Sequence, residues 1–331
     1  MARLRRVRPL RDDGIRRVRR GNGFQYLDGT GRPVADQDRA RIDALVIPPA
    51  WTDVWISGHE RGHIQAVGTD DAGRRQYIYH PDWVKRRDRG KYERMLALAS
   101  ALPSARARVT RSLRSDELGR ERVLATAFRL LDEAAPRIGS ERYFAENGNR
   151  GLTTLQRRDA SVDGATVTLS FPGKGGKRQD IEVEDADLAA VIAELVGGPP
   201  RSPLLAYRRG RRRIPLKPKD VNDYVRELTG GAFSAKDFRT LRGTIAAAES
   251  LARTGVSATE RDRRKAEQAA VKATSALLGN TPSVARNSYI DPRVWMRYKD
   301  GDLLDLTGSP EAAIGRLLRP VRQEARTATF R

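Results

Sequence analysis

The spacing of apolar residues changes along this chain of 331 residues, and the change restricts the folds that are open to it. Up to about residue 89, short apolar runs alternate with turn-forming residues, a pattern that predicts β-strands. From about residue 90 the apolar positions recur at helical spacing; Leu124, Phe128 and Leu131 share one face of a predicted helix over 121–135. We therefore expect an α+β protein of two domains: a small, mainly β one over 1–89 and a larger, mainly α one over 90–331.

Turn signals separate the predicted strands of the smaller domain. An apolar run over 23–28 leads into a glycine- and proline-containing turn at 29–33, which predicts a β-hairpin. A second turn signal at 69–73 lies between two further strand patterns. The elements expected here are strands over 23–28, 54–56, 63–67 and 74–79 and a short helix over 36–45.

The larger domain interrupts its helices with a small β insertion. Val167, Leu169 and Phe171 alternate with polar residues, and a glycine-rich segment at 172–177 separates them from a second alternating run over 180–184. This order predicts a hairpin with lysines at its tip.

Capping residues mark the helix boundaries of this domain. Ser234 and Asp237 have the spacing of a capping box, and Gly255 is a plausible end for the helix that they begin. Thr281 followed by Pro282 predicts another helix start. The remaining helices are expected over 186–196, 218–228, 234–254, 260–278 and 310–325.

The charge of the chain points to a polyanionic partner. Lysine and arginine number 63 against 42 acidic residues, a net charge of +21 that is spread over the whole chain. Such a field attracts nucleic acid first and an anionic membrane surface second. No apolar run approaches the roughly 20 residues of a membrane-spanning helix. The opening residues lack the apolar core of a signal peptide, so we expect a cytoplasmic protein.

Several kinds of site are disfavoured by what the chain lacks. It has no cysteine, which excludes disulfides, thiolate metal sites and a thiol nucleophile. A zinc site built from His59, His63 and His80 is not expected, because Gly58 and Gly62 oppose the helix that such a site would need. No phosphate-binding loop and no carboxylate cluster is found. We therefore expect no cofactor and no metal.

Covalent catalysis by this chain would have to use a hydroxyl, an amine or a carboxylate. Among the nine tyrosines, Tyr289 ends the segment that contains Gly279, Asn280, Thr281, Pro282 and Ser283. Taken alone, this tyrosine would more often be a half-buried aromatic at the end of a helix.

The segment resembles the active-site segment of poxvirus-like type IB DNA topoisomerases, Gly-His-Thr-Pro-Ser followed by five residues and the nucleophilic tyrosine. Four more segments resemble this family in the same order, so that the likeness covers roughly residues 45–298. They are 62–66 with 74–79, 136–155, 171–174 and 235–240. The resemblance implies a larger domain with the catalytic fold of tyrosine recombinases and type IB topoisomerases.

The resemblance also implies a role for each matched residue. Tyr289 would attack a phosphodiester and form a 3′-phosphotyrosyl intermediate with a free 5′-OH. Arg137 and Arg239 would neutralise the two nonbridging oxygens, because guanidinium groups donate in pairs and stay charged. Lys174 would protonate the leaving 5′ oxygen, and Lys177 remains its alternative. Where the viral motif has histidine this chain has Asn280, which can donate a hydrogen bond but cannot carry a proton at neutral pH.

Double-stranded DNA is the expected partner, bound by a monomer associated with the nucleoid. The resemblance places Gln76, Tyr77 and Tyr79 on a strand in the major groove, where glutamine can bind adenine edges. Arg142, Tyr143 and Lys236 would contact phosphates near the cleaved bond. Binding through phosphates predicts that affinity falls steeply as salt rises. The expected activity is the relaxation of supercoiled DNA without ATP or a required metal.

Two other functions stay open at this point. A tyrosine site-specific recombinase would share the catalytic residues, but the position three residues before the second arginine is Lys236 instead of the usual histidine. A non-catalytic DNA-binding protein would account for the charge but would form no covalent adduct with DNA.

Overall fold

A computed structural model describes residues 3–319, and the chain divides into two compact units, 1–91 and 92–331. The boundary falls inside the long helix α2 (Pro81–Leu113). This helix begins about nine residues before residue 90, where the apolar residues of the sequence change to helical spacing. The run of charged residues over 85–89 carries no apolar periodicity, which explains why the pattern missed the first turns.

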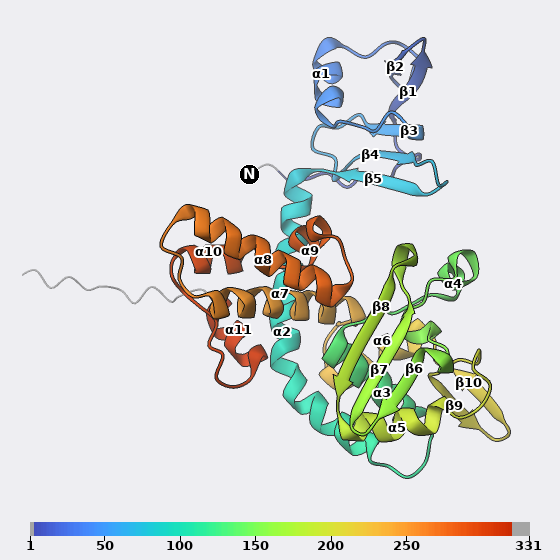
Figure 1. Ribbon diagram of the computed structural model, residues 1–331. Helices are drawn as coiled ribbons and strands as arrows, with labels where there is room; N and C mark the ends of the chain where they lie inside the picture. Colours follow the sequence, from blue (N-terminus) through green and yellow to red (C-terminus); the bar gives the residue numbers. More distant parts are fainter. Residues whose placement is uncertain (1–2, 320–331) are drawn as a thin grey trace, which may run out of the picture. The chain divides into compact units, whose positions relative to one another are not determined.

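The first unit is a twisted antiparallel sheet of five strands in the order β2-β1-β3-β4-β5, with one helix packed on it (Figure 1). Ile15, Ile42 and Ile56 are in the core between the helix and the sheet. A smaller cluster, which includes Trp55 and Val67, lies apart from this core. The elements are β1 (Gly14–Arg20), β2 (Gly23–Leu27), α1 (Asp36–Ala44), β3 (Thr52–Ser57), β4 (Ile64–Thr69) and β5 (Arg75–Tyr79).

The hairpin expected around 29–33 does not form as two paired strands. The turn itself is present, since the backbone N–H of Asp28 donates to the carbonyl of Arg32 at 2.8 Å. Beyond one bridge between Leu27 and Pro33, however, the chain goes on to α1. The true partner of β2 is β1, whose many exposed arginines hide the alternation of a strand.

The second unit consists mainly of helices around one large apolar core. Phe128 of α3 and Phe238 of α7 meet edge to face in this core, with ring centroids 5.4 Å apart. The expected helices are confirmed, with one difference at the last of them. The helix expected over 310–325 ends at Leu318. Residues 320–325 of that prediction lie outside the described part of the chain. The helices are α3 (Arg120–Ala134), α4 (Glu141–Asn147), α5 (Ala186–Val196), α6 (Pro218–Thr229), α7 (Ala235–Thr254), α8 (Glu260–Leu278), α9 (Pro282–Tyr289), α10 (Arg293–Lys299) and α11 (Pro310–Leu318).

Two small sheets accompany these helices. The predicted hairpin is formed by β7 (Thr166–Pro172) and β8 (Arg178–Glu184), and a third strand, β6 (Ala160–Asp163), pairs with β7 (Figure 1). A separate hairpin of β9 (Ala206–Arg209) and β10 (Arg212–Pro215) lies in an arginine-rich stretch that gave no strand signal. Among residues 3–319, no helix is long and apolar enough to cross a membrane.

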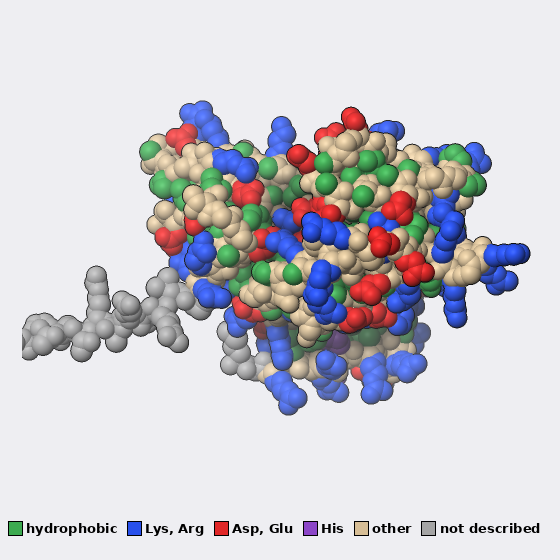
Figure 2. Space-filling view, turned by 90° about the horizontal axis from the view of Figure 1, so that it is seen from below, with side chains coloured by type: hydrophobic (Ala, Val, Ile, Leu, Met, Phe, Trp, Pro, Cys, Tyr) green, Lys and Arg blue, Asp and Glu red, His purple; other side chains and the backbone are tan. Residues whose placement is uncertain are grey.

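On the face shown in Figure 2, lysines and arginines are interspersed with aspartates and glutamates. The net charge of +21 therefore does not by itself identify one binding surface on that face.

Candidate active site

Arg239 is a buried cation held by the ends of two helices. It lies near the start of α7, where the expected capping box is present. In this capping box the carboxylate of Asp237 accepts hydrogen bonds from the N–H and the hydroxyl of Ser234, both at 2.9 Å. Its guanidinium donates to the carbonyls of Ala135 at 2.6 Å and Leu278 at 2.8 Å.

Those carbonyls belong to the C-terminal ends of α3 and α8, where carbonyl groups lack helical partners and the helix dipole is negative. Burial lowers the pKa of Arg239, whose side chain has little exposed surface. The two helix ends supply acceptors that favour the charged form.

Arg137 follows α3 directly and is held in place by its backbone. Helix α3 ends at Ala135 with a left-handed φ of 46°, and Pro136 then directs the chain away from the helix. The carbonyl of Arg137 accepts from the N–H of Leu152 at 2.8 Å. Gly151 is required beside it, because an added Cβ would lie 2.5 Å from that carbonyl oxygen.

Asn280 joins the two arginines. It lies between the end of α8 and the start of α9, where the hydroxyl of Thr281 caps the next helix as expected. The Oδ1 of Asn280 accepts hydrogen bonds from Arg137 and, at 3.5 Å, from Arg239. Its Nδ2 is buried and has no hydrogen-bond partner within residues 3–319. The site therefore contains an amide donor that is desolvated and available.

Tyr289 is the last residue of α9 and lies against Arg239, whose guanidinium carbon is 5.0 Å from the centre of the tyrosine ring. Burial raises the pKa of Tyr289, but the positive charges of Arg239, Arg137 and Lys236 outweigh this effect. The pKa of the phenol is consequently below its ordinary value of 10.0. The surrounding cations therefore favour the phenolate, which is the nucleophilic form.

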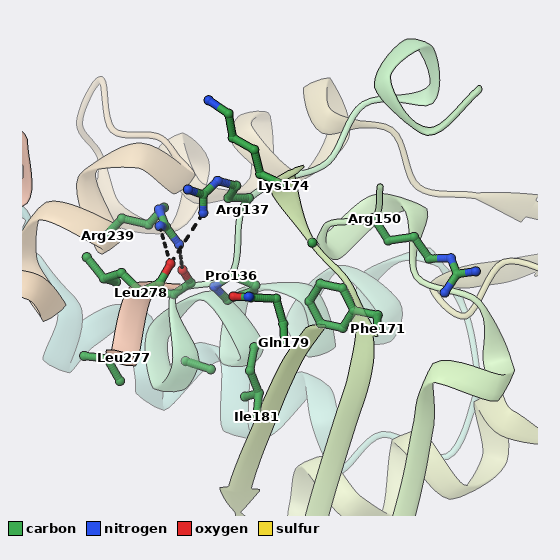
Figure 3. A pocket seen from close by; sticks show the side chains of 13 residues that line it. Pro136, Arg137, Arg150, Phe171, Lys174, Gln179, Ile181, Arg239, Leu277 and Leu278 are labelled. Atoms are coloured by element: carbon green, nitrogen blue, oxygen red, sulfur yellow. Dashed lines mark hydrogen bonds between the residues drawn. The ribbon is translucent and has the colours of Figure 1, made fainter. Parts of the chain in front are cut away.

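Lys174 is at the tip of the β7–β8 hairpin and borders a small pocket together with Arg137 and Arg239 (Figure 3). Its side chain is exposed and makes no hydrogen bond or ion pair with the described residues. Lys177, the alternative general acid, does not border this pocket. Gln179 of β8 also borders it, although it carried no sequence signal.

The residues expected to contact DNA belong to three elements, β5 of the first unit and α4 and α7 of the second. Tyr77 and Tyr79 share one face of β5 with stacked rings 5.9 Å apart, while the side chain of Gln76 donates to Asp70 at 2.8 Å. Tyr79 packs beside an apolar cluster and Tyr77 is exposed, so one of the two tyrosines is partly structural.

The phosphate-contact candidates belong to the second unit. Arg142 and Tyr143 are exposed on α4, a helix that the sequence pattern did not predict, and Arg142 pairs with Glu146 at 2.7 Å. Lys236 is exposed in the first turn of α7 and is close enough to lower the pKa of Tyr289. No group of histidines and carboxylates within residues 3–319 could hold a metal ion.

Comparison with known proteins bears on the same residues. A family described as the catalytic core of eukaryotic DNA topoisomerase I matches residues 80–300, and one described as the N-terminal domain of bacterial DNA topoisomerase IB matches residues 23–70. The chain is 26% identical to DNA topoisomerase 1B of Acanthamoeba polyphaga mimivirus over 88% of its own length and 93% of the viral protein. It is 20% identical to DNA topoisomerase 1B of vaccinia virus (strain Copenhagen) over 83% of its own length and 87% of the viral protein. All five candidate catalytic residues lie inside the longer family match.

Proposed function

This chain belongs to the type IB DNA topoisomerases, and we propose from this that it relaxes supercoiled duplex DNA by cutting one strand, letting it rotate and resealing it. One observation supports the chemistry above all others. The phenol of Tyr289 lies against Arg239, and Arg239 and Arg137 both donate to Asn280. A tyrosine surrounded by permanent cations is suited to attack a phosphodiester.

In the proposed reaction, the Tyr289 oxygen attacks the phosphorus and the bond to the 5′ oxygen breaks. A 3′-phosphotyrosyl bond and a free 5′-OH result, and religation is the reverse reaction. Because the energy of the broken bond is kept in the phosphotyrosyl bond, the cycle needs no ATP.

The transition state places added negative charge on the nonbridging oxygens. Arg137 and Arg239 supply paired donors for this charge, and the unpartnered Nδ2 of Asn280 supplies a third donor. The helix-end carbonyls fix Arg239 in place before substrate binds, so little reorganisation accompanies the reaction. Asn280 thus acts by hydrogen bonding.

Lys174 is the proposed general acid for the leaving 5′ oxygen. It borders the same pocket as both arginines, which favours it over Lys177. Because a glycine-rich turn carries this lysine, bound DNA can bring its amine to the 5′ oxygen.

The remaining parts of the proposal, which concern fold, partner and DNA contacts, are based on the similarity to type IB topoisomerases. The second unit is proposed to have the catalytic fold that type IB topoisomerases share with tyrosine recombinases. The protein would act as a monomer on double-stranded DNA in the nucleoid, with no cofactor. Tyr77 and Tyr79 would contact the major groove, and Arg142, Tyr143 and Lys236 would contact phosphates.

Plasmid relaxation by the purified chain tests the proposal. With EDTA and no ATP, supercoiled plasmid should relax, and denaturing the reaction should trap protein on the 3′ end of the cut strand. Tyr289→Phe should abolish both, because it removes the attacking oxygen and keeps the ring. Relaxation by Tyr289→Phe would disprove the mechanism.

The same reactions separate the two rival functions. A site-specific recombinase would exchange strands between two paired sites, and a non-catalytic DNA-binding protein would never yield the adduct.

A further inference from the structure

The backbone that follows Tyr289 is held by side-chain hydroxyls from two other helices. The hydroxyl of Thr244 in α7 donates to the carbonyl of Tyr289 at 3.2 Å and accepts from the N–H of Asp291 at 3.2 Å. The hydroxyl of Tyr92 in α2 donates to the carbonyl of Ile290 at 2.8 Å. These groups would otherwise lack partners, because α9 ends at Tyr289.

Helix α9 packs few buried side chains against its neighbours, although Arg286 also pairs with Glu267 of α8 at 3.0 Å. It is eight residues long, and Ala285 is its only fully buried residue. A helix this short gains little stability from its own hydrogen bonds and depends on tertiary contacts. Its C-terminal end, which carries the proposed nucleophile, is where the two hydroxyls act.

Close packing against α7 adds to this restraint. Gly243 leaves room for the nucleophile's backbone, since a Cβ at this position would lie 2.9 Å from the carbonyl oxygen of Tyr289 and 3.1 Å from its Cβ. Arg239 is one helical turn before Gly243 on the same helix. Helix α7 therefore carries both the transition-state cation and the groups that set the distance from that cation to the nucleophile.

We propose that Thr244 and Tyr92 are positioning residues that hold the backbone of Tyr289 in line for attack. The proposal rests on the proposed function, since it concerns the same nucleophile. In-line attack requires the phenolic oxygen within a few tenths of an ångström of its reactive position. A displacement of about 1 Å can lower a rate by roughly 100-fold.

Single-turnover cleavage at saturating DNA tests this proposal with two variants that remove only a hydroxyl, Thr244→Val and Tyr92→Phe. We expect each to slow cleavage by roughly 10- to 100-fold. The dissociation constant for DNA should stay close to that of the wild type. Religation should slow by a similar factor, because the same alignment serves both directions, so the fraction of adduct at equilibrium should change little.

Two matched controls separate positioning from loss of stability. Thr126→Val removes an equally buried hydroxyl that donates to the carbonyl of Arg122 at 2.9 Å. Tyr298→Phe removes one that donates to the carbonyl of Gly255 at 2.9 Å and shares a hydrogen bond with the hydroxyl of Ser257 at 2.6 Å. We expect Tyr298→Phe, which breaks contacts between elements, to lower the melting temperature about as much as the test variants, and both controls to cleave at the wild-type rate. Thr244→Ser, which keeps the hydroxyl, should restore most of the rate.

A further variant keeps the proposal testable if Thr244→Val does not fold. Gly243→Ala keeps both hydroxyl groups but forces α7 and the Tyr289 backbone apart, and it should also slow cleavage at unchanged affinity. Gly315→Ala in α11, where an added Cβ meets nothing within 4 Å, is its control.

Two results would overturn the proposal: wild-type cleavage rates in Thr244→Val and Tyr92→Phe, or equal slowing in the controls. Failure of the proposed function would look different, because the wild-type chain itself would then form no adduct.

Discussion

A buried arginine that is held by two carbonyls is the central residue of this site. A side chain without these donors at position 239 would take away the hydrogen bond to Ala135 and leave the carbonyl of Leu278 with the longer one, 3.4 Å, from Arg137. The same carbonyls hold the guanidinium still, so that its charge is already oriented when DNA arrives. The structural role of this residue and its proposed catalytic role therefore depend on the same contacts, which makes Arg239 a poor choice for isolating one of them.

Asn280 allows a cleaner separation, because its two amide atoms do different things. The Oδ1 accepts from the arginines, whereas the Nδ2 has no partner among the described residues. We predict that Asn280→Asp, which keeps the acceptor and loses the donor, slows cleavage by roughly 10²–10³-fold, as expected for a lost transition-state donor. Single-turnover cleavage at saturating DNA measures this.

Asn280→Ala is the companion variant, and it should be impaired to a similar degree. If Asn280→Asp cleaved at the wild-type rate, the Nδ2 would have no part in the reaction. DNA affinity should fall more for the aspartate than for the alanine, because only aspartate adds a negative charge near the phosphate.

At the scale of elements, the β7–β8 hairpin determines which lysine reaches the site. The alternation of Val167, Leu169 and Phe171 packs one face of β7 into the core and thereby fixes the register of the tip. Within that register, Lys174 borders the pocket and Lys177 does not. The assignment of the general acid thus depends on strand register.

We predict that Lys174→Ala slows cleavage by roughly 10²–10⁴-fold, the usual contribution of a general acid. Lys177→Ala is the control and should cleave at nearly the wild-type rate. Replacing the leaving 5′ oxygen of the substrate by sulfur should rescue Lys174→Ala, because a thiolate departs without protonation. The assignment fails if the sulfur substrate leaves Lys174→Ala as slow as before, or if Lys177→Ala shows the larger defect.

At the scale of the whole second unit, a buried network of charges joins four helices. Asp132 of α3 pairs with Arg106 of α2 at 2.7 Å, and Arg106 also pairs with Glu311 of α11 at 2.5 Å. Arg242 of α7 reaches both carboxylates, at 3.4 and 3.6 Å. Burial raises the pKa of Glu311, but hydrogen bonds from Arg106 and Ser309 outweigh it and lower the pKa to about 2.

This network predicts an acid-dependent loss of stability. Since the pKa of Glu311 is lower in the folded state than its ordinary value of 4.5, its contribution is fully present above about pH 4.5 and declines as the pH falls toward about 2. Glu311→Gln should lower the free energy of unfolding by about 3 kcal/mol near neutral pH. The difference from the wild type should shrink between pH 4.5 and 2. Urea unfolding across this range measures both effects.

Glu227→Gln is the control, because Glu227 forms an exposed ion pair with Arg108 at 3.7 Å. It should change stability little at any pH. A difference between wild type and Glu311→Gln that stays constant down to pH 2 would contradict the assigned role of Glu311.

Local signals accounted for most of the secondary structure. The caps at Ser234 and Thr281 and the β7–β8 alternation act over a few residues, and the structure confirms each of them. The failures occurred where side chains carry no periodic signal: β1 and the β9–β10 hairpin are rich in exposed arginines, and α4 has no buried residue. Such elements depend on contacts with neighbouring parts of the fold, which the local sequence pattern does not encode.

By itself, the sequence determined the change from β to helical structure, the residue types available for chemistry, and the family to which their spacing belongs. Only the tertiary structure decided how those residues are held. The contact of Arg239 with Ala135 joins positions 104 residues apart, and the hydroxyl of Thr244 reaches Tyr289 across 45 residues. Periodicity and capping extend over a few residues, whereas these contacts exist only once the helix ends have packed together. The sequence segment thus singles out Tyr289, but its lowered pKa comes from the fold.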